Sequence, residues 1–314
     1  MNLIFLGTPD FAVPSLKAII DSKKHNILAV VTQPDKPVGR NAVLTPSPVK
    51  VCALEHGIKV LQYNKIRFEG VEDIKKLNPD IMVTCAFGQI LSQEIIDIPA
   101  HGIINVHASL LPKYRGAAPI QYAVINGDDE TGVTIMQTEV GIDTGDILAV
   151  KKTKIGDDET AGELFDRLSV LGAELIVDTL DEIENNTIIP VNQDETKATH
   201  VKMLTKESGK IDWSNPSEVI RNLIRGTNPW PCAHTFLNGK ILKIFKAKNI
   251  NKEHFDCCND KIPCGTVLEA SKKLLVKTGD GVLEIDELQL EGSKRMNSEA
   301  FLLGRRINKG DVLK

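Results

Sequence analysis

The stretch from residue 102 to 112 contains the pair of side chains best suited to chemistry. Asn105 and His107 stand two residues apart at the end of a short, mostly apolar run, residues 103–106. Residues two apart on a β-strand point to the same face of the sheet, and open α/β sheets place their ligand sites at the carboxyl ends of strands. An amide and an imidazole there can donate hydrogen bonds to a developing oxyanion. The alternative is a polar strand end in which Asn105 caps a turn and His107 is solvated.

Asp143 offers a carboxylate in a short turn bounded by Gly141 and Gly145. Glycines on both sides allow the backbone to approach a ligand closely and fix an unusual turn. A carboxylate beside His107 would orient the imidazole and favour its protonated form. The alternative is an Asx turn, which is common for aspartate in such loops. Sequence separation alone does not place Asp143 against His107, so the site depends on the fold that joins them.

Alternating strands and helices in the first half of the chain are expected to position these groups. Short, partly β-branched apolar runs, typical of buried parallel strands, occupy residues 2–6, 27–31, 81–84 and 103–106. Amphipathic helical patterns lie between them at residues 13–21, 49–56 and 71–77. This alternation predicts an α/β layer fold with right-handed crossovers.

The pattern changes after residue 130. Two longer strands are expected at residues 131–138 and 146–154, followed by one long helix over residues 160–185. A polar stretch without periodicity then indicates a linker, and beyond it a short helix near 217–224 and several strands separated by turn signals predict a small β-barrel. The expected domains are residues 1–189, a linker over 190–208, and residues 209–314.

The composition is that of a packed globular protein, and its charge is unevenly distributed. The net charge is −4, yet residues 206–314 contain 19 Lys+Arg and 14 Asp+Glu (net +5), whereas residues 1–205 contain 19 and 28 (net −9). A basic C-terminal part permits contact with a polyanion, although ordinary surface variation gives the same numbers.

Several classes of protein are disfavoured by the sequence. The six cysteines form no CxxC pair and no zinc-site spacing with histidine, so free thiols in a reducing compartment and no metal site are expected. No apolar run reaches the roughly 18 residues of a membrane span. The first residues read as a strand and not as a signal peptide, which favours a cytoplasmic protein.

Four sequence blocks, in order, resemble the folate-dependent formyltransferase family. They are Asn-x-His at 105–107 with Ser-Leu-Leu-Pro at 109–112, Tyr-Arg-Gly-Ala-Ala-Pro-Ile-Gln at 114–121, Gly-Val-Thr-Ile-Met at 132–136, and Gly-Ile-Asp-Thr-Gly-Asp-Ile at 141–147. The resemblance extends over essentially the whole chain, because it includes residues 5–12, 228–231 and 278–281. These additional segments resemble the family members that formylate methionyl-tRNA. The resemblance implies an α/β, Rossmann-like formyltransferase domain followed by a small OB-like β-barrel that binds tRNA.

The resemblance also implies roles for individual residues. The catalytic residues would be Asn105, His107 and Asp143. The tetrahydrofolate site would be lined by Ser109, Leu110, Leu111 and Pro112, with the pterin held by backbone groups of Ala86, Phe87, Gly88 and Gln89. Arg40 would reach the tRNA acceptor end, where its fork suits a phosphate or a base edge; the alternative is a solvated loop charge. Some family members carry lysines after this arginine, whereas this chain has Asn-Ala-Val at 41–43, so the loop should be less basic.

The implied reaction is direct transfer of the formyl group of 10-formyltetrahydrofolate to the α-amine of initiator methionyl-tRNA. Asn105 and the protonated edge of His107 would stabilise a tetrahedral oxyanion, while Asp143 keeps the imidazole charged and a nearby water takes the amine proton. No serine or cysteine in these blocks has a base spaced to activate it, so no covalent enzyme intermediate is expected. The implied partners are the folate co-substrate and the tRNA, and a monomer is expected.

Three other functions remain open at this point. The same catalytic half could formylate a nucleotide sugar or a glycinamide ribotide. The chain could be a folate- or RNA-binding module without catalysis, its barrel serving as the binder. A dinucleotide oxidoreductase is the third, and it is disfavoured because Gly7-Thr8-Pro9 after the first strand is not the GxGxxG fingerprint.

Overall fold

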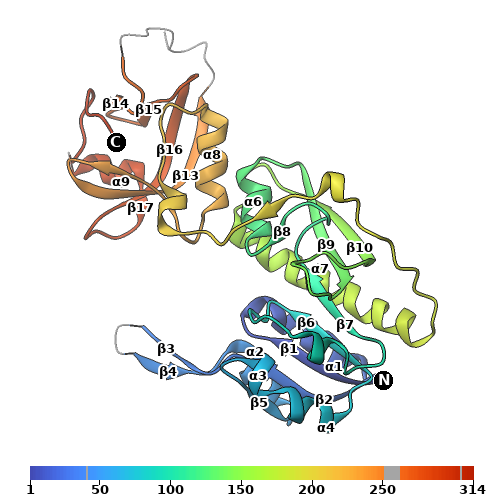
Figure 1. The fold of residues 1–314 in the computed structure, drawn as a ribbon. Helices are drawn as coiled ribbons and strands as arrows, with labels where there is room; N and C mark the ends of the chain where they lie inside the picture. Colours follow the sequence, from blue (N-terminus) through green and yellow to red (C-terminus); the bar gives the residue numbers. More distant parts are fainter. Residues whose placement is uncertain (40–41, 251–261, 305) are drawn as a thin grey trace. The chain divides into compact units, whose positions relative to one another are not determined.

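The computed structural model describes residues 1–39, 42–250, 262–304 and 306–314, and the chain divides into two compact units (Figure 1). The first unit consists of Met1–Pro119, Glu130–Lys154 and Phe165–Val201, and the second of Ile120–Asp129, Ile155–Leu164 and Lys202–Lys314. Residues 190–201 of the segment expected to be a linker therefore belong to the first unit. No helix in the described ranges is both long and apolar enough to cross a membrane.

A seven-stranded sheet forms the centre of the first unit. Its order is β10 (Ile147–Lys154), β9 (Glu130–Gln137), β7 (Ile103–His107), β6 (Ile81–Cys85), β1 (Asn2–Gly7), β2 (Asn26–Thr32) and β5 (Val60–Gln62). The five strands from β7 to β5 are parallel, whereas β9 runs antiparallel to both β7 and β10. The central strands are apolar on both faces because helices cover both sides of such a sheet. This confirms the predicted α/β fold.

Helices and two short strand pairs complete the first unit. The helices are η1 (Asp10–Ala12), α1 (Val13–Ser22), α2 (Pro48–Glu55), α3 (Ile66–Glu69), α4 (Val71–Leu77), α5 (Gln93–Ile96) and η2 (Glu195–Lys197), and α6 (Pro119–Ile125) and α7 (Ala161–Glu184) each contribute residues to both units. The strand pairs are β3 (Lys36–Val38) with β4 (Val43–Thr45) and β8 (Arg115–Gly116) with β11 (His200–Val201). Helix α2 begins as its sequence predicts, because Ser47 accepts a hydrogen bond from the Lys50 backbone and Pro48 stands in the first turn.

The register between β6 and β7 decides where the site lies. Thr84 pairs with Asn105 and Cys85 with Val106, so the two parallel strands end together. The loops that follow them, residues 86–89 and 108–112, consequently leave the same edge of the sheet. This is the edge at which parallel α/β sheets bind ligands.

The second unit is built on an antiparallel sheet, which confirms the predicted change of architecture. Its order is β12 (Ala233–Leu237), β13 (Lys240–Ile250), β16 (Val282–Leu290), β15 (Leu274–Lys277) and β14 (Val267–Ala270), with β17 (Met296–Asn297) paired to β16. The described helices are η3 (Lys206–Gly209), α8 (Ser217–Gly226) and α9 (Ser298–Leu303). The expected turn at Asn238 and Gly239 joins β12 to β13, and both residues have positive φ, as two-residue hairpins require.

Candidate active site

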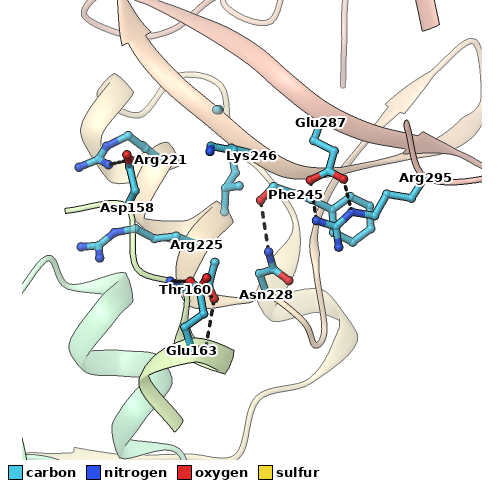
Figure 2. Close-up of a pocket in the computed structure, with 12 residues that line it drawn as sticks. Asp158, Thr160, Glu163, Arg221, Arg225, Asn228, Phe245, Lys246, Glu287 and Arg295 are labelled. Atoms are coloured by element: carbon cyan, nitrogen blue, oxygen red, sulfur yellow. Dashed lines mark hydrogen bonds and ion pairs between the residues drawn. The ribbon is translucent and has the colours of Figure 1, made fainter. Parts of the chain in front are cut away.

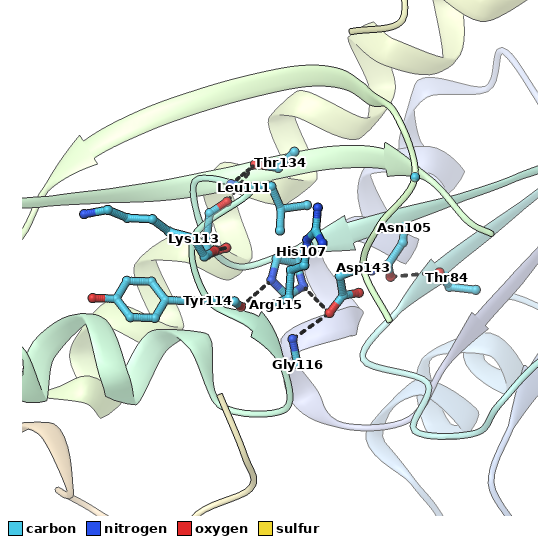
Figure 3. A network of polar contacts seen from close by, with 12 residues as sticks. Thr84, Asn105, His107, Leu111, Lys113, Tyr114, Arg115, Gly116, Thr134 and Asp143 are labelled. Atoms are coloured by element: carbon cyan, nitrogen blue, oxygen red, sulfur yellow. Dashed lines mark hydrogen bonds and ion pairs between the residues drawn. The ribbon is translucent and has the colours of Figure 1, made fainter. Parts of the chain in front are cut away.

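Asn105 lies at the carboxyl end of β7 and is half-buried. Its Oδ1 accepts a hydrogen bond of 2.8 Å from Thr84 Oγ1 on the neighbouring strand (Figure 3). The same hydroxyl also lies 3.2 Å from the Ile104 carbonyl, and in this orientation of the amide the oxygen of Asn105 faces the hydroxyl. In the part of the chain that the structure describes, the NH2 group has no partner, and so it is the group that can donate to a ligand.

His107 follows on the same strand, and only 6% of its surface is exposed. Its Nε2 lies 3.0 Å from the Tyr114 carbonyl oxygen. Since a carbonyl only accepts, Nε2 carries a hydrogen and donates it. Its Nδ1 lies 3.6 Å from Asp143 Oδ2, which is an ion pair when the ring is protonated but is longer than a direct hydrogen bond (Figure 3). The fold therefore brings His107 and Asp143 together from distant parts of the sequence.

Asp143 is held in an unusual backbone conformation within its turn. Its φ is +54°, in the left-handed region that aspartate tolerates better than most residues. Gly145 is required beside it, because a Cβ there would stand 1.9 Å from the Gln137 carbonyl oxygen. The Gly116 amide of β8 donates a 2.8 Å hydrogen bond to Asp143 Oδ2. One carboxylate oxygen thus faces both Gly116 and the imidazole.

In this geometry Asn105 and His107 differ in whether they can donate a hydrogen bond to a ligand. Both ring nitrogens of His107 face acceptors of the chain itself, so the ring does not present an N–H group outward in this arrangement. If the ring is protonated, it could stabilise a developing oxyanion only through its charge, whereas the Asn105 amide could donate a hydrogen bond. The sequence expectation had given a donor role to both residues.

The segment after β7 is anchored to β9. Ser109 is fully buried and donates from Oγ to the Lys113 carbonyl at 2.6 Å. Thr134 of β9 donates to the Ser109 carbonyl at 2.7 Å and accepts from the Leu111 amide at 3.2 Å. Ser109 and Leu111 are therefore interior residues, while Leu110 and Pro112 are half-buried and leave part of their apolar surface exposed.

The loop after β6 combines exposed backbone with internal anchors. Ala86 and Gly88 are exposed and have φ of +46° and +76°. Phe87 between them is buried, at 4% exposure. The carbonyls of Phe87 and Gly88 accept from Gln33 Nε2 at 3.1 and 3.2 Å. The exposed backbone of Ala86 and the Gly88 N–H group lie at this edge of the sheet, whereas the Gly88 carbonyl is already bound by Gln33.

The Gln89 side chain holds two parts of the first unit together. Its Oε1 accepts from the Ile66 amide and its Nε2 donates to the Tyr63 carbonyl, both at 2.8 Å. Gln89 therefore uses its side chain to fix the chain that follows β5. A ligand contact by this residue would have to come from its backbone.

Arg40 lies outside the described residues, but the hairpin that leads to it is partly described. Lys50 donates to both carboxylate oxygens of Asp35, at 2.7 and 2.9 Å, and to Gln62 at 2.9 Å. The hydrogen bonds that Asp35 accepts from Lys50 and from Gln62 lower the pKa of its carboxyl and tie the base of the hairpin to its neighbours. Farther along, Val43 and Leu44 are 61% and 66% exposed.

Two family models together match most of the chain. A family model described as formyl transferase matches residues 1–180, and its C-terminal domain model matches residues 203–306. The chain belongs to the formyl transferase family. The resemblance seen in the sequence blocks is thereby confirmed, and with it the assignment of the chain as a transferase.

Full-length relatives and a solved structure extend this result. The methionyl-tRNA formyltransferase of Agathobacter rectalis is 51% identical over 99% of this chain and 98% of its own length. That of Caldanaerobacter subterraneus subsp. tengcongensis is 48% identical over 100% of both chains. An N-formyltransferase from Helicobacter canadensis, solved in complex with folinic acid and dTDP-3-aminofucose, has a TM-score of 0.68 at 22% identity over 94% of this chain and 99% of its own. At that identity it shows a shared fold.

One part of the site has no counterpart in the sequence-based expectations. Arg115 is 1% exposed and is the largest of the fully buried side chains. Its guanidinium donates to Gln193 and Glu195, both in the segment expected to be a linker. The available signals were the arginine in the block at residues 114–121 and the polar run that includes Gln193 and Glu195, but neither alone indicates a contact.

A cavity of about 250 Å³ lies in the second unit (Figure 2). Most of the arginines around it are paired internally: Arg221 with Glu218 at 2.7 Å, and Arg295 with Glu287 at 2.6 Å. Arg225 is buried, and burial lowers its pKa. The lining thus carries both signs of charge, and two of its arginines are already paired with glutamates.

A second charged cluster lies in the first unit. His25 has a fully buried side chain whose Nε2 is 3.8 Å from Asp181 and whose Nδ1 is 3.7 Å from Glu184. These three residues could ligate a cation. However, the Met1 ammonium already contacts Glu184 at 2.8 Å and Lys24 pairs with Asp181, so positive charge is supplied by the chain itself.

Proposed function

We propose that this formyl transferase transfers the formyl group of 10-formyltetrahydrofolate to the free α-amino group of initiator methionyl-tRNA. The observation that carries the proposal is the full-length identity of 51% and 48% with two methionyl-tRNA formyltransferases. The site supports the same chemistry, since a free amide donor and a His–Asp pair meet at the ligand-binding edge of the sheet.

Asn105, His107 and Asp143 are proposed as the catalytic residues. The NH2 group of Asn105 donates to the formyl oxygen as negative charge develops on it, and a protonated His107 adds its charge nearby. The new C–N bond forms to the α-amine, the bond from the formyl carbon to folate N10 breaks, and the proton that the amine loses balances the one that N10 gains. Asp143 Oδ1 receives no hydrogen bond from the described residues and is the oxygen suited to accept that proton through a water.

The proposed folate site lies along the sheet edge beside these residues. When bound, the folate co-substrate supplies the activated formyl group. Leu110 and Pro112 would offer apolar surface to it, and the backbone at Ala86 and Gly88 would offer polar groups. These segments would be fixed by residues that do not themselves contact the folate through their side chains. They are held by burial and internal hydrogen bonds of Ser109, Leu111, Phe87 and Gln89.

The tRNA is proposed to contact both units. Arg40 is assigned to the acceptor end, and the C-terminal domain, whose residues 206–314 carry a net charge of +5, is assigned to the tRNA backbone. We propose that the protein acts in the cytoplasm as a monomer.

The decisive experiment is a formylation assay with charged initiator tRNA and 10-formyltetrahydrofolate, with a charged non-initiator tRNA as control. We expect formyl-methionyl-tRNA from the initiator, with an apparent affinity that falls steeply as salt rises because phosphate contacts release counterions. Formylation of an amino sugar nucleotide or a glycinamide ribotide in place of the tRNA, with little dependence on salt, would overturn the proposal.

A further inference from the structure

The Asp143 turn is attached to the rest of the first unit at two points. The side chain is attached through Oδ2, which accepts from the Gly116 amide at 2.8 Å. The backbone is attached through Gln193, whose Nε2 donates to the carbonyls of Asp143 and Gly145 at 2.8 and 2.7 Å. A residue with φ of +54° is in a sparsely populated conformation, and such conformations persist where surrounding contacts impose them.

The amide of Gln193 is itself fully engaged and can have only one orientation. Its Oε1 accepts from Arg115 Nε at 3.0 Å and from Nη2 at 2.8 Å. A guanidinium only donates and a carbonyl only accepts, so a flipped amide would place donor against donor and acceptor against acceptor. Arg115 thus dictates that the NH2 group of Gln193 faces the turn.

Arg115 is in turn fixed by a second partner and by its strand. Its Nη1 and Nη2 bind Glu195 at 3.0 and 2.6 Å in a bidentate pair, the geometry that orients a guanidinium most strongly. Its backbone amide donates to the Thr199 carbonyl at 2.8 Å. Arg115 and Gly116 are consecutive, so one two-residue strand holds the side chain of Asp143 directly and its backbone through Gln193.

We propose that Gln193 and Arg115 are positioning residues that set Asp143 against His107 for formyl transfer. This inference rests on the proposed function, since it concerns the same site. Neither residue needs to touch substrate. Their effect is on the placement of the carboxylate, which lies 3.6 Å from the imidazole, and a misplacement of about 1 Å at an active site can reduce the rate by roughly 100-fold.

The test variant is Gln193→Glu, because it separates the two contacts of the side chain. A glutamate keeps an oxygen for Arg115 but faces the carbonyls of Asp143 and Gly145 with a second acceptor, so the turn is released while the link to Arg115 survives. We expect kcat to fall by about 10- to 100-fold with KM for both substrates within about threefold. The Gly116 amide should exchange its hydrogen at least tenfold faster, because its acceptor has moved.

A double-mutant cycle distinguishes positioning from a general structural role. With Asp143→Asn already present, adding Gln193→Glu should reduce kcat by no more than about threefold, because residues that act through one another are not additive. Asp194→Asn, an exposed neighbour whose side chain binds Thr196 and Lys197, is the matched control and should match the wild-type protein in kcat and in Gly116 exchange.

The outcomes separate the two proposals. Formylation of charged initiator tRNA by the wild-type protein tests the proposed function alone, and the exchange of the Gly116 amide tests the positioning without any substrate. The positioning role would be overturned if Gln193→Glu left both kcat and the Gly116 exchange rate unchanged. It would also be overturned if the losses of kcat in the double-mutant cycle were fully additive. Should Gln193→Glu fold poorly, Gln193→Met removes both contacts at similar length and is judged by the same criteria.

Discussion

Two loops of the first unit contain residues proposed to take part in the reaction, and they differ in where hydrogen bonds hold them. The turn around Asp143 is bound at its side chain by Gly116 and at its backbone by Gln193. The β3–β4 hairpin, which leads toward Arg40, is fixed at its base by Asp35 and Lys50 and exposes apolar side chains farther out. A carboxylate proposed for catalysis must be held in one place, whereas the hairpin is proposed to contact the tRNA.

The largest expected effect comes from changing the carboxylate of Asp143 itself. Asp143→Asn keeps the size of the side chain and an acceptor for the Gly116 amide, but it removes the charge and the proton acceptor. We expect kcat to fall on the order of 100- to 10,000-fold, with the thermal midpoint close to that of the wild-type protein. Single-turnover formylation and a thermal melt measure the two quantities, and a variant with near-normal turnover would contradict the role of Asp143.

An intermediate effect is expected from loosening the base of the hairpin. Lys50→Met removes the three hydrogen bonds to Asp35 and Gln62 while keeping an unbranched side chain. Charged hydrogen bonds contribute about 1.5–3 kcal/mol, so KM for tRNA should rise by about tenfold with kcat changed little. Steady-state kinetics with tRNA varied measures this, and Lys76→Met on the surface of α4 serves as the control. A fall in kcat without a change in KM would show that the hairpin affects the catalytic step and not the binding of tRNA.

The smallest expected effect is a dependence of stability on pH at Glu195. The hydrogen bonds from Arg115 lower the pKa of this carboxyl from its ordinary value of 4.5. A lowered pKa in the folded state means that the pair stabilises the fold above pH 4.5 and loses this contribution as pH falls through the folded-state value. Glu195→Gln should therefore melt below the wild-type protein at pH 7, and the two midpoints should converge below pH 4.5. A constant difference across that window would show that the charge of Glu195 does not stabilise Arg115.

Much of the fold followed from local patterns. The apolar, β-branched runs at residues 2–6, 81–84 and 103–106 are typical of strands buried in a parallel sheet, and β1, β6 and β7 are found there. The helix expected over residues 160–185 is α7, Ala161–Glu184. The two-residue turn at Asn238 and Gly239 was predictable because its backbone requires positive φ.

The site could be predicted only in part. Asn105 and His107 were recognisable because strand periodicity puts them on one face, and Asp143 was joined to them by the family resemblance. Gln193 and Glu195 were not recognisable, since polar residues without periodicity indicate a linker when considered alone. Their role arises from a tertiary contact with the buried Arg115, and no local pattern encodes that contact. The short β8–β11 pair was missed for the same reason.

The position of Arg115 has a practical consequence for anyone who divides this protein. The polar composition after residue 189 suggests a domain boundary there. A fragment that ends at residue 189 would lack Gln193, Glu195 and β11, the strand that pairs with β8. The Arg115 guanidinium would then lose both its carboxylate and its amide partner, and a buried cation left without partners is strongly destabilising. Fragments, fusions and domain exchanges should keep the chain intact through Val201.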